Sequence, residues 1–122
     1  MKAREIRECV YLVGAVDLDR RLFDALVPIP DGTSYNAYLV QGTEGTALLD
    51  TVDPSMSDTL LSQLAEIANI DYVVAHHAEQ DHSGSIPLVL SMYPKAKVIA
   101  TPRGKGMLMD LLGIPYERFA TV

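Results

Sequence analysis

The hydrophobic pattern of this chain changes once, at Asp53-Pro54, and that change limits the fold more than any other feature of the sequence. Before it, four short apolar stretches predict strands, at 9–16, 20–26, 35–40 and 47–51. After it, helical and strand-like spacing alternate, with helical spacing at 60–68, 85–93 and 101–112 and strands at 71–75 and 97–100. A strand-rich start followed by β-α-β-α units predicts an α/β fold of the α+β type, with a mixed, mostly antiparallel sheet and helices on one face.

Turn and cap residues mark the ends of these predicted elements. Pro54 after Asp53 is typical of a helix start, Thr101-Pro102 caps the last helix, and Gly113 stops it. The glycine-containing connector 41–45 suits a hairpin between two strands. We expect 28–32, PIPDG, to lie outside any strand ladder, because proline lacks the donor and Asp-Gly favours a turn.

The predicted helices are enough to cover only one face of the sheet. The stretches 10–16 and 71–75 are nevertheless too apolar to face water on the other side. We therefore expect the second face to be covered either by a missing C-terminal half of the domain or by another copy in a homo-oligomer. In this interpretation the 122 residues are half of a larger unit.

Length and composition exclude several classes of protein. A chain of 122 residues with 48% hydrophobic residues forms one globular domain. A net charge of −6, with no extended basic cluster, argues against nucleic acid as a partner, and no apolar run is long enough to cross a membrane. The single cysteine, Cys9, forms no intramolecular disulfide and is expected to be a buried thiol. The charged N-terminus does not resemble a signal peptide, so we expect a cytoplasmic protein.

The segment 76–82, HHAEQDH, contains every histidine of the chain, and it directly follows a predicted buried strand. If the chain stays extended, His77, Glu79 and Asp81 point the same way, and His82 turns toward the same point. Two imidazoles and two carboxylates suit iron or manganese, and zinc accepts the same donors. His76 faces the other way and is interpreted as a flanking residue. The alternative is a polar loop whose histidines cap the next helix.

The stretch from His77 to Ser85, HAEQDHSGS, resembles the first metal motif of the flavodiiron proteins, also called A-type flavoproteins. These proteins belong to the metallo-β-lactamase-like superfamily. The segments 13–24, 30–38 and 47–54 also resemble the start of such a protein. Typical hydrolases of the superfamily have a second histidine where this chain has Glu79, so the resemblance favours the diiron branch over a metal-dependent hydrolase.

The resemblance implies a fold and a set of site residues. Residues 1–122 would form the N-terminal half of a metallo-β-lactamase-like αββα domain, with no flavodoxin-like domain present. His77 and Glu79 would bind one iron, and Asp81 and His82 the other. Asp50 would not bind metal itself but would support the loop that carries the ligands. The alternative is an ordinary, solvent-exposed aspartate at a strand end. No catalytic residue beyond the metal ligands and no cofactor-binding residue is implied.

The family reduces dioxygen to water or nitric oxide to nitrous oxide, with electrons passing through FMN to the diiron site. A complete site needs later ligands, but no histidine follows His82, and Asp110 lies within a predicted helix. We therefore expect a fragment of an oxidoreductase that is inactive alone, with iron and FMN as parent cofactors and a flavodoxin- or rubredoxin-type electron donor. The alternatives are a non-catalytic, oligomeric binding or structural module and, less favoured, a hydrolase.

Overall fold

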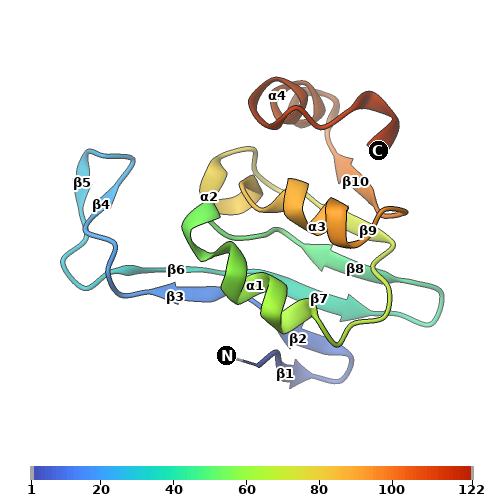
Figure 1. The fold of residues 1–122 in the computed structure, drawn as a ribbon, viewed down its shortest axis with the longest axis horizontal. Coiled ribbons are helices and arrows are strands. Elements are labelled where there is room, and N and C mark those ends of the chain that lie inside the picture. The colour runs from blue at the N-terminus through green and yellow to red at the C-terminus, as the bar shows by residue number, and fades with distance from the viewer. Residues whose placement is uncertain (1, 122) are drawn as a thin grey trace.

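The main sheet has seven strands, and β9 lies in it between β8 and β10 (Figure 1). The structure, a computed structural model, describes residues 2–121. In sheet order the strands are β1 (Arg4–Arg7), β2 (Val10–Leu12), β7 (Tyr38–Gln41), β8 (Thr46–Leu49), β9 (Tyr72–Val74), β10 (Lys97–Ala100) and β11 (Phe119–Thr121). Two smaller sheets pair β3 (Ala15–Asp17) with β6 (Thr33–Tyr35) and β4 (Leu22–Phe23) with β5 (Val27–Pro28).

The helices lie in the second half of the chain, as the change of period predicts. They are α1 (Ser57–Leu64), preceded by the 3₁₀ turn η1 (Pro54–Met56), then α2 (Gln80–Ser83), α3 (Ile86–Met92), α4 (Pro102–Leu112) and the 3₁₀ turn η2 (Tyr116–Arg118). The predicted caps are confirmed, because the Asp53 side chain accepts from Ser55 N–H, the Thr101 side chain accepts from Gly104 N–H, and Gly113 is left-handed. Among residues 2–121, no helix is long and apolar enough to span a membrane.

The sheet is mixed, as predicted. Strands β1, β2, β7 and β8 pair antiparallel, and β8, β9, β10 and β11 pair parallel. With the two small sheets, five of the eight described pairings are antiparallel. The predicted hairpin at 41–45 joins β7 to β8, with Gly42 N–H donating to Gly45 O. Parallel strands need crossover connections, and helices α1, α3 and α4 supply them.

Two predicted strands are each divided between two sheets, which corrects the sequence prediction. The stretch 9–16 separates into β2 and β3, and 35–40 separates into β6 and β7. The break falls at Gly14, where a Cβ atom would lie 2.0 Å from Tyr35 O. The two chain segments approach so closely there that only glycine fits, and each then changes its partner.

The segment 20–29 also differs from its prediction. Instead of one strand at 20–26, it forms the β4–β5 hairpin, whose turn residues Asp24 and Ala25 have positive φ. Pro28 was expected outside any ladder, yet it pairs with Leu22, because a two-stranded sheet has open edges that tolerate proline. Cys9 was expected to be buried but is exposed in the turn between β1 and β2, with a φ of 61°.

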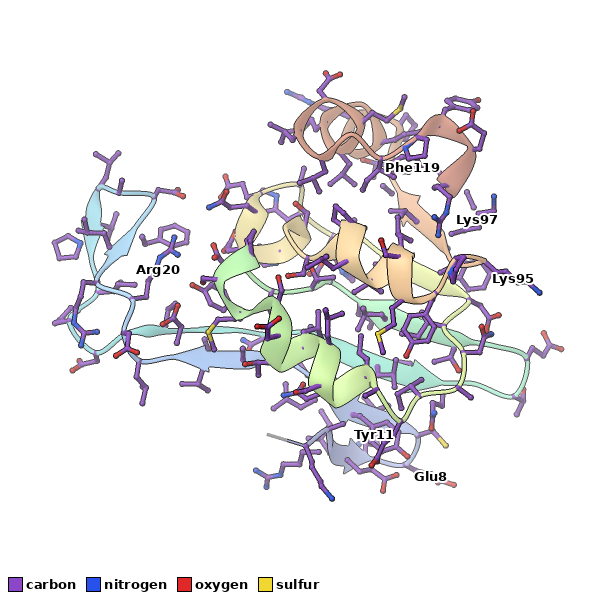
Figure 2. All side chains as sticks on the ribbon, in the orientation of Figure 1. Glu8, Tyr11, Arg20, Lys95, Lys97 and Phe119 are labelled. Atoms are coloured by element: carbon purple, nitrogen blue, oxygen red, sulfur yellow. The ribbon has the colours of Figure 1, made fainter. Side chains whose placement is uncertain are left out.

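One face of the sheet is packed and the other is open. Leu39, Leu48, Val73 and Val98 align across neighbouring strands and are fully buried on the side that α1 and α3 cover (Figure 1). Tyr11 and Phe119 pack against this core near opposite ends of the sheet (Figure 2). The side chains next to these along each strand point to the opposite face and also form a row across the sheet. We call this row the open face, and its side chains are only half-buried: Leu12, Tyr38, Leu49, Val74, Ile99 and Ala120.

Leu48 and Leu49 are neighbours on β8 that point to opposite faces, so they test this arrangement directly. We expect Leu48→Ala to lower the free energy of unfolding by about 2–5 kcal/mol, because it leaves a cavity in the core. Leu49→Ala removes a half-exposed side chain and should cost about 1 kcal/mol. Urea denaturation at low protein concentration measures both values. Equal losses for the two variants would contradict the assignment of the faces.

Candidate metal centre

The candidate site lies where two adjacent parallel strands end. Asp50 follows β8 directly, and the histidine-rich segment begins two residues after the end of β9. The Asp50 N–H donates to Val74 O at 2.9 Å, which holds the two strand ends together. The carboxyl ends of parallel strands are a usual place for ligands in α/β sheets.

Asp50 contacts the segment at both ends. Its Oδ1 accepts a hydrogen bond from the His76 N–H at 2.8 Å, and its Oδ2 lies 3.3 Å from His82 Nδ1. The residue adopts a left-handed backbone with a φ of 59° and is 9% exposed. It is therefore not a solvent-exposed strand end, and its carboxylate orients the segment that carries the four predicted ligands.

The four predicted ligands form two pairs, each with one nitrogen and one oxygen donor. His77 Nε2 lies 3.6 Å from Glu79 Oε1, and His82 Nε2 lies 3.5 Å from Asp81 Oδ2. The two imidazole rings are in edge contact, with their centroids 5.3 Å apart. The two pairs therefore lie next to each other at the end of β9.

The route by which the ligands meet differs from the prediction. Glu79 is the residue that precedes helix α2, and Asp81 and His82 belong to that helix. Asp81 therefore does not continue the alternation of an extended strand, and that part of the prediction is wrong. Ala78 is buried, whereas its neighbours His77 and Glu79 are exposed, so these two side chains point away from the core on either side of Ala78. His76 has an exposed side chain near Asp50 and stays apart from the two pairs.

These donors fit an iron site in kind but are too few to complete one. Imidazole and carboxylate together are the donors that non-haem iron prefers. Within residues 2–121, however, no group of three or more histidine, cysteine or acidic side chains is arranged to hold an ion by itself. By themselves, the four predicted ligands therefore form no complete metal site.

A cavity of about 320 Å³ adjoins the acidic members of these pairs, Glu79 and Asp81. Arg20, labelled in Figure 2, also lines it, and its Nη1 lies 3.5 Å from Oδ1 of the buried Asp53. Tyr35 also lines the cavity and donates its hydroxyl to Asp17 Oδ2 at 3.3 Å. Burial raises the pKa of Tyr35 to about 12; Arg20 opposes this shift, and Asp53 and Asp17 add to it. Tyr35 is therefore a protonated donor at neutral pH.

Sequence reasoning missed the hydroxyl groups that hold the segment in place. Thr51 donates twice to His82 O, and Ser83 Oγ donates to Ala78 O at 2.7 Å. Ser85 Oγ donates to Val52 O at 2.8 Å. The only signals were Ser83 and Ser85 directly after the histidine-rich segment and Thr51 at a predicted strand end, and these do not reveal their partners.

Asp50 offers a test of these contacts that needs no metal. We expect Asp50→Ala to lower the free energy of unfolding by about 2–3 kcal/mol, because alanine disfavours a left-handed backbone and two contacts are lost. Asp50→Asn should cost about 1 kcal/mol, since asparagine tolerates this conformation and keeps an acceptor. Urea denaturation followed by circular dichroism gives both values. The exposed Asp110→Ala is the control, and a loss as large as that of Asp50→Ala would contradict the interpretation.

The comparisons with known proteins agree with this geometry. The family model of the metallo-beta-lactamase superfamily matches residues 30–121. The chain is 40% identical over 113 residues to the type A flavoprotein of Rhodobacter capsulatus, covering 90% of this chain and 26% of that protein. It is 38% identical over 102 residues to a nitric oxide reductase of Moorella thermoacetica. That match covers 80% of this chain and 25% of the reductase. The structure of rubredoxin oxygen:oxidoreductase from Desulfovibrio gigas matches with a TM-score of 0.90 and 32% identity. That match covers 99% of this chain and 31% of the oxidoreductase.

The chain spans about a quarter to a third of the length of these relatives. Their similarity extends over 80–99% of this chain. The chain belongs to the metallo-β-lactamase superfamily, and it corresponds to the metallo-β-lactamase domain in the N-terminal part of the flavodiiron proteins.

Proposed function

We propose that this chain supplies one half of a non-haem diiron site in a flavodiiron-type oxidoreductase. His77 and Glu79 would bind one iron, and Asp81 and His82 the other. The observation that carries the proposal is the pair of adjacent imidazole–carboxylate couples at the end of β9, with Asp50 in contact with His82. Glu79 favours iron over the zinc of typical hydrolases, because it provides an oxygen donor where those enzymes have an imidazole.

The relatives support a reaction with a diatomic gas. Their names describe a rubredoxin oxygen:oxidoreductase and a nitric oxide reductase. We propose reduction of dioxygen to water or of nitric oxide to nitrous oxide as the parent activity. When bound, iron would bind the gas and exchange electrons with FMN held by a domain outside these residues. A flavodoxin- or rubredoxin-type protein would supply those electrons, and a cytoplasmic location belongs to the same proposal.

The chain's own residues would set the direction of the ligands. Asp50 Oδ2 lies 3.3 Å from His82 Nδ1 and can accept a hydrogen bond from that nitrogen. His82 Nε2, on the side of Asp81, would then be the nitrogen available to bind an iron. Tyr35 is a protonated hydroxyl that lines the adjoining cavity together with Arg20 and Asp53.

The site needs ligands that these 122 residues do not carry, since no histidine follows His82. We propose that the chain forms the N-terminal half of a metallo-β-lactamase-like domain and that a second half completes both the site and the sheet. Alone, the chain would not complete a catalytic cycle. As an isolated polypeptide it would behave as an oligomeric module, because the open face remains to be covered.

The first test of the proposal is metal content. The chain is equilibrated with ferrous iron by dialysis without oxygen, and the bound iron is measured by inductively coupled plasma mass spectrometry. Because further ligands are missing, we expect the wild-type chain to bind iron weakly, and each paired variant, His77→Ala with Glu79→Ala or Asp81→Ala with His82→Ala, to lose roughly half of that iron, since each pair would serve one ion. His76→Ala is the matched control and should retain full iron. No iron in the wild type, or an equal loss in His76→Ala, would overturn the proposal.

The second test concerns the open face. We expect the wild-type chain to self-associate as its concentration rises, because a row of apolar side chains crosses this face. The double variant Leu49→Lys with Ile99→Lys should be monomeric, with an unchanged circular dichroism spectrum. Light scattering coupled to size exclusion measures the mass, and Leu111→Lys on the exposed side of α4 is the control. A wild-type chain that stays monomeric at high concentration would contradict this part.

A further inference from the structure

The hydroxyl groups between two loops bear on how His82 is placed. The first loop, 50–56, connects β8 to α1 and includes η1, and the second, 76–85, includes α2 and carries the predicted ligands. Thr51 is 1% exposed and joins them by two hydrogen bonds to one atom. Its N–H and its Oγ1 each donate to His82 O at 2.7 Å.

The His82 carbonyl needs such donors. It belongs to α2, a helix of four residues, and the last carbonyl groups of a helix have no partner within the helix. A carbonyl left without a donor at a buried position destabilises that conformation. Thr51 donates to it twice, and so fixes the peptide plane that follows the His82 side chain.

The surrounding contacts prevent the two loops from separating. Ser85 Oγ donates to Val52 O and lies 2.8 Å from Ser57 Oγ, so two buried serines add a second connection. At Gly84, a Cβ atom would lie 2.5 Å from Pro54 Cδ, which shows how closely the loops are packed. The Thr51 hydroxyl therefore lies where the two loops are closely packed, and it contacts the backbone from which the His82 ring extends.

We propose that Thr51 is a positioning residue for His82, and through it for the Asp81–His82 half of the metal centre. This inference rests on the proposed function only for its consequence at the metal. Asp50 orients the imidazole ring, whereas Thr51 fixes the backbone from which the ring extends. The two adjacent residues at the end of β8 thus hold His82 at two separate points.

The placement of His82 is tested first in the metal-free chain. Thr51→Val removes the hydroxyl at nearly equal volume, and Thr51→Ser retains it. We expect Thr51→Val to shift the amide resonances of 78–83 and to speed their hydrogen exchange about tenfold, as lost local bonds do. Thr51→Ser should match the wild type. Ser62→Ala is the control, because Ser62 Oγ also donates to a backbone carbonyl, that of Thr59, but on an exposed side of α1.

The metal-free result decides the inference by itself. If 78–83 is unchanged in Thr51→Val, or equally disturbed in Thr51→Ser, Thr51 does not position His82. Should Thr51→Val fail to fold, Thr51→Ala replaces it as a smaller variant without the hydroxyl. A folded variant with an altered segment and an unaltered α3 and β10 supports the proposal.

Metal affinity then separates this inference from the proposed function. We expect ferrous iron to bind Thr51→Val roughly tenfold more weakly than wild type, with Thr51→Ser restoring the affinity, since groups behind a ligand contribute at least this much. If the wild-type chain binds no iron while Thr51→Val still alters 78–83, the proposed function fails and the positioning role stands. If wild type and Thr51→Val bind iron equally, the role of Thr51 at the metal is wrong and the proposed function stands.

Discussion

The contact of Asp50 with the histidine-rich segment is the interaction on which the site depends. One carboxylate at the end of β8 accepts from the first residue of the segment and lies against the ring of its last residue. This requires β8 and β9 to be parallel neighbours and Asp50 to adopt a left-handed backbone. The strain of that conformation is offset by the contacts of the carboxylate, which accepts from the partly buried His76 N–H and lies against the His82 ring.

Strands β8 and β9 lie in the middle of the main sheet, which has one packed face and one open face. Strand β8 is where the antiparallel half of the sheet meets the parallel half. The crossover helices of the parallel half give one face its core, and the open face retains a half-buried apolar row. Under the proposed function, one second half of the domain would supply both the further ligands and the cover for the open face.

Much of the site was predictable because its residues are neighbours in the sequence. His77, Glu79, Asp81 and His82 are close in the chain, and a buried strand before them predicts their place at a sheet edge. The helix α2 was not predictable, because four residues do not show a helical period and its packing against Thr51 decides it. The division of the N-terminal strands was missed because it also depends on a tertiary contact: Gly14 and Tyr35 meet only in the folded chain.

The sequence by itself determined the class of fold, the ends of the helices and the chemistry of the donors, since periodicity, caps and side-chain type are local properties. Only the tertiary structure decided which strands pair, that Asp50 and Thr51 hold His82 at two points, and that Cys9 is exposed. These features depend on contacts between residues about 30 positions apart, such as Thr51 and His82. Their free energy comes from packing and from satisfying buried polar groups, and neither is encoded in a short stretch of residues.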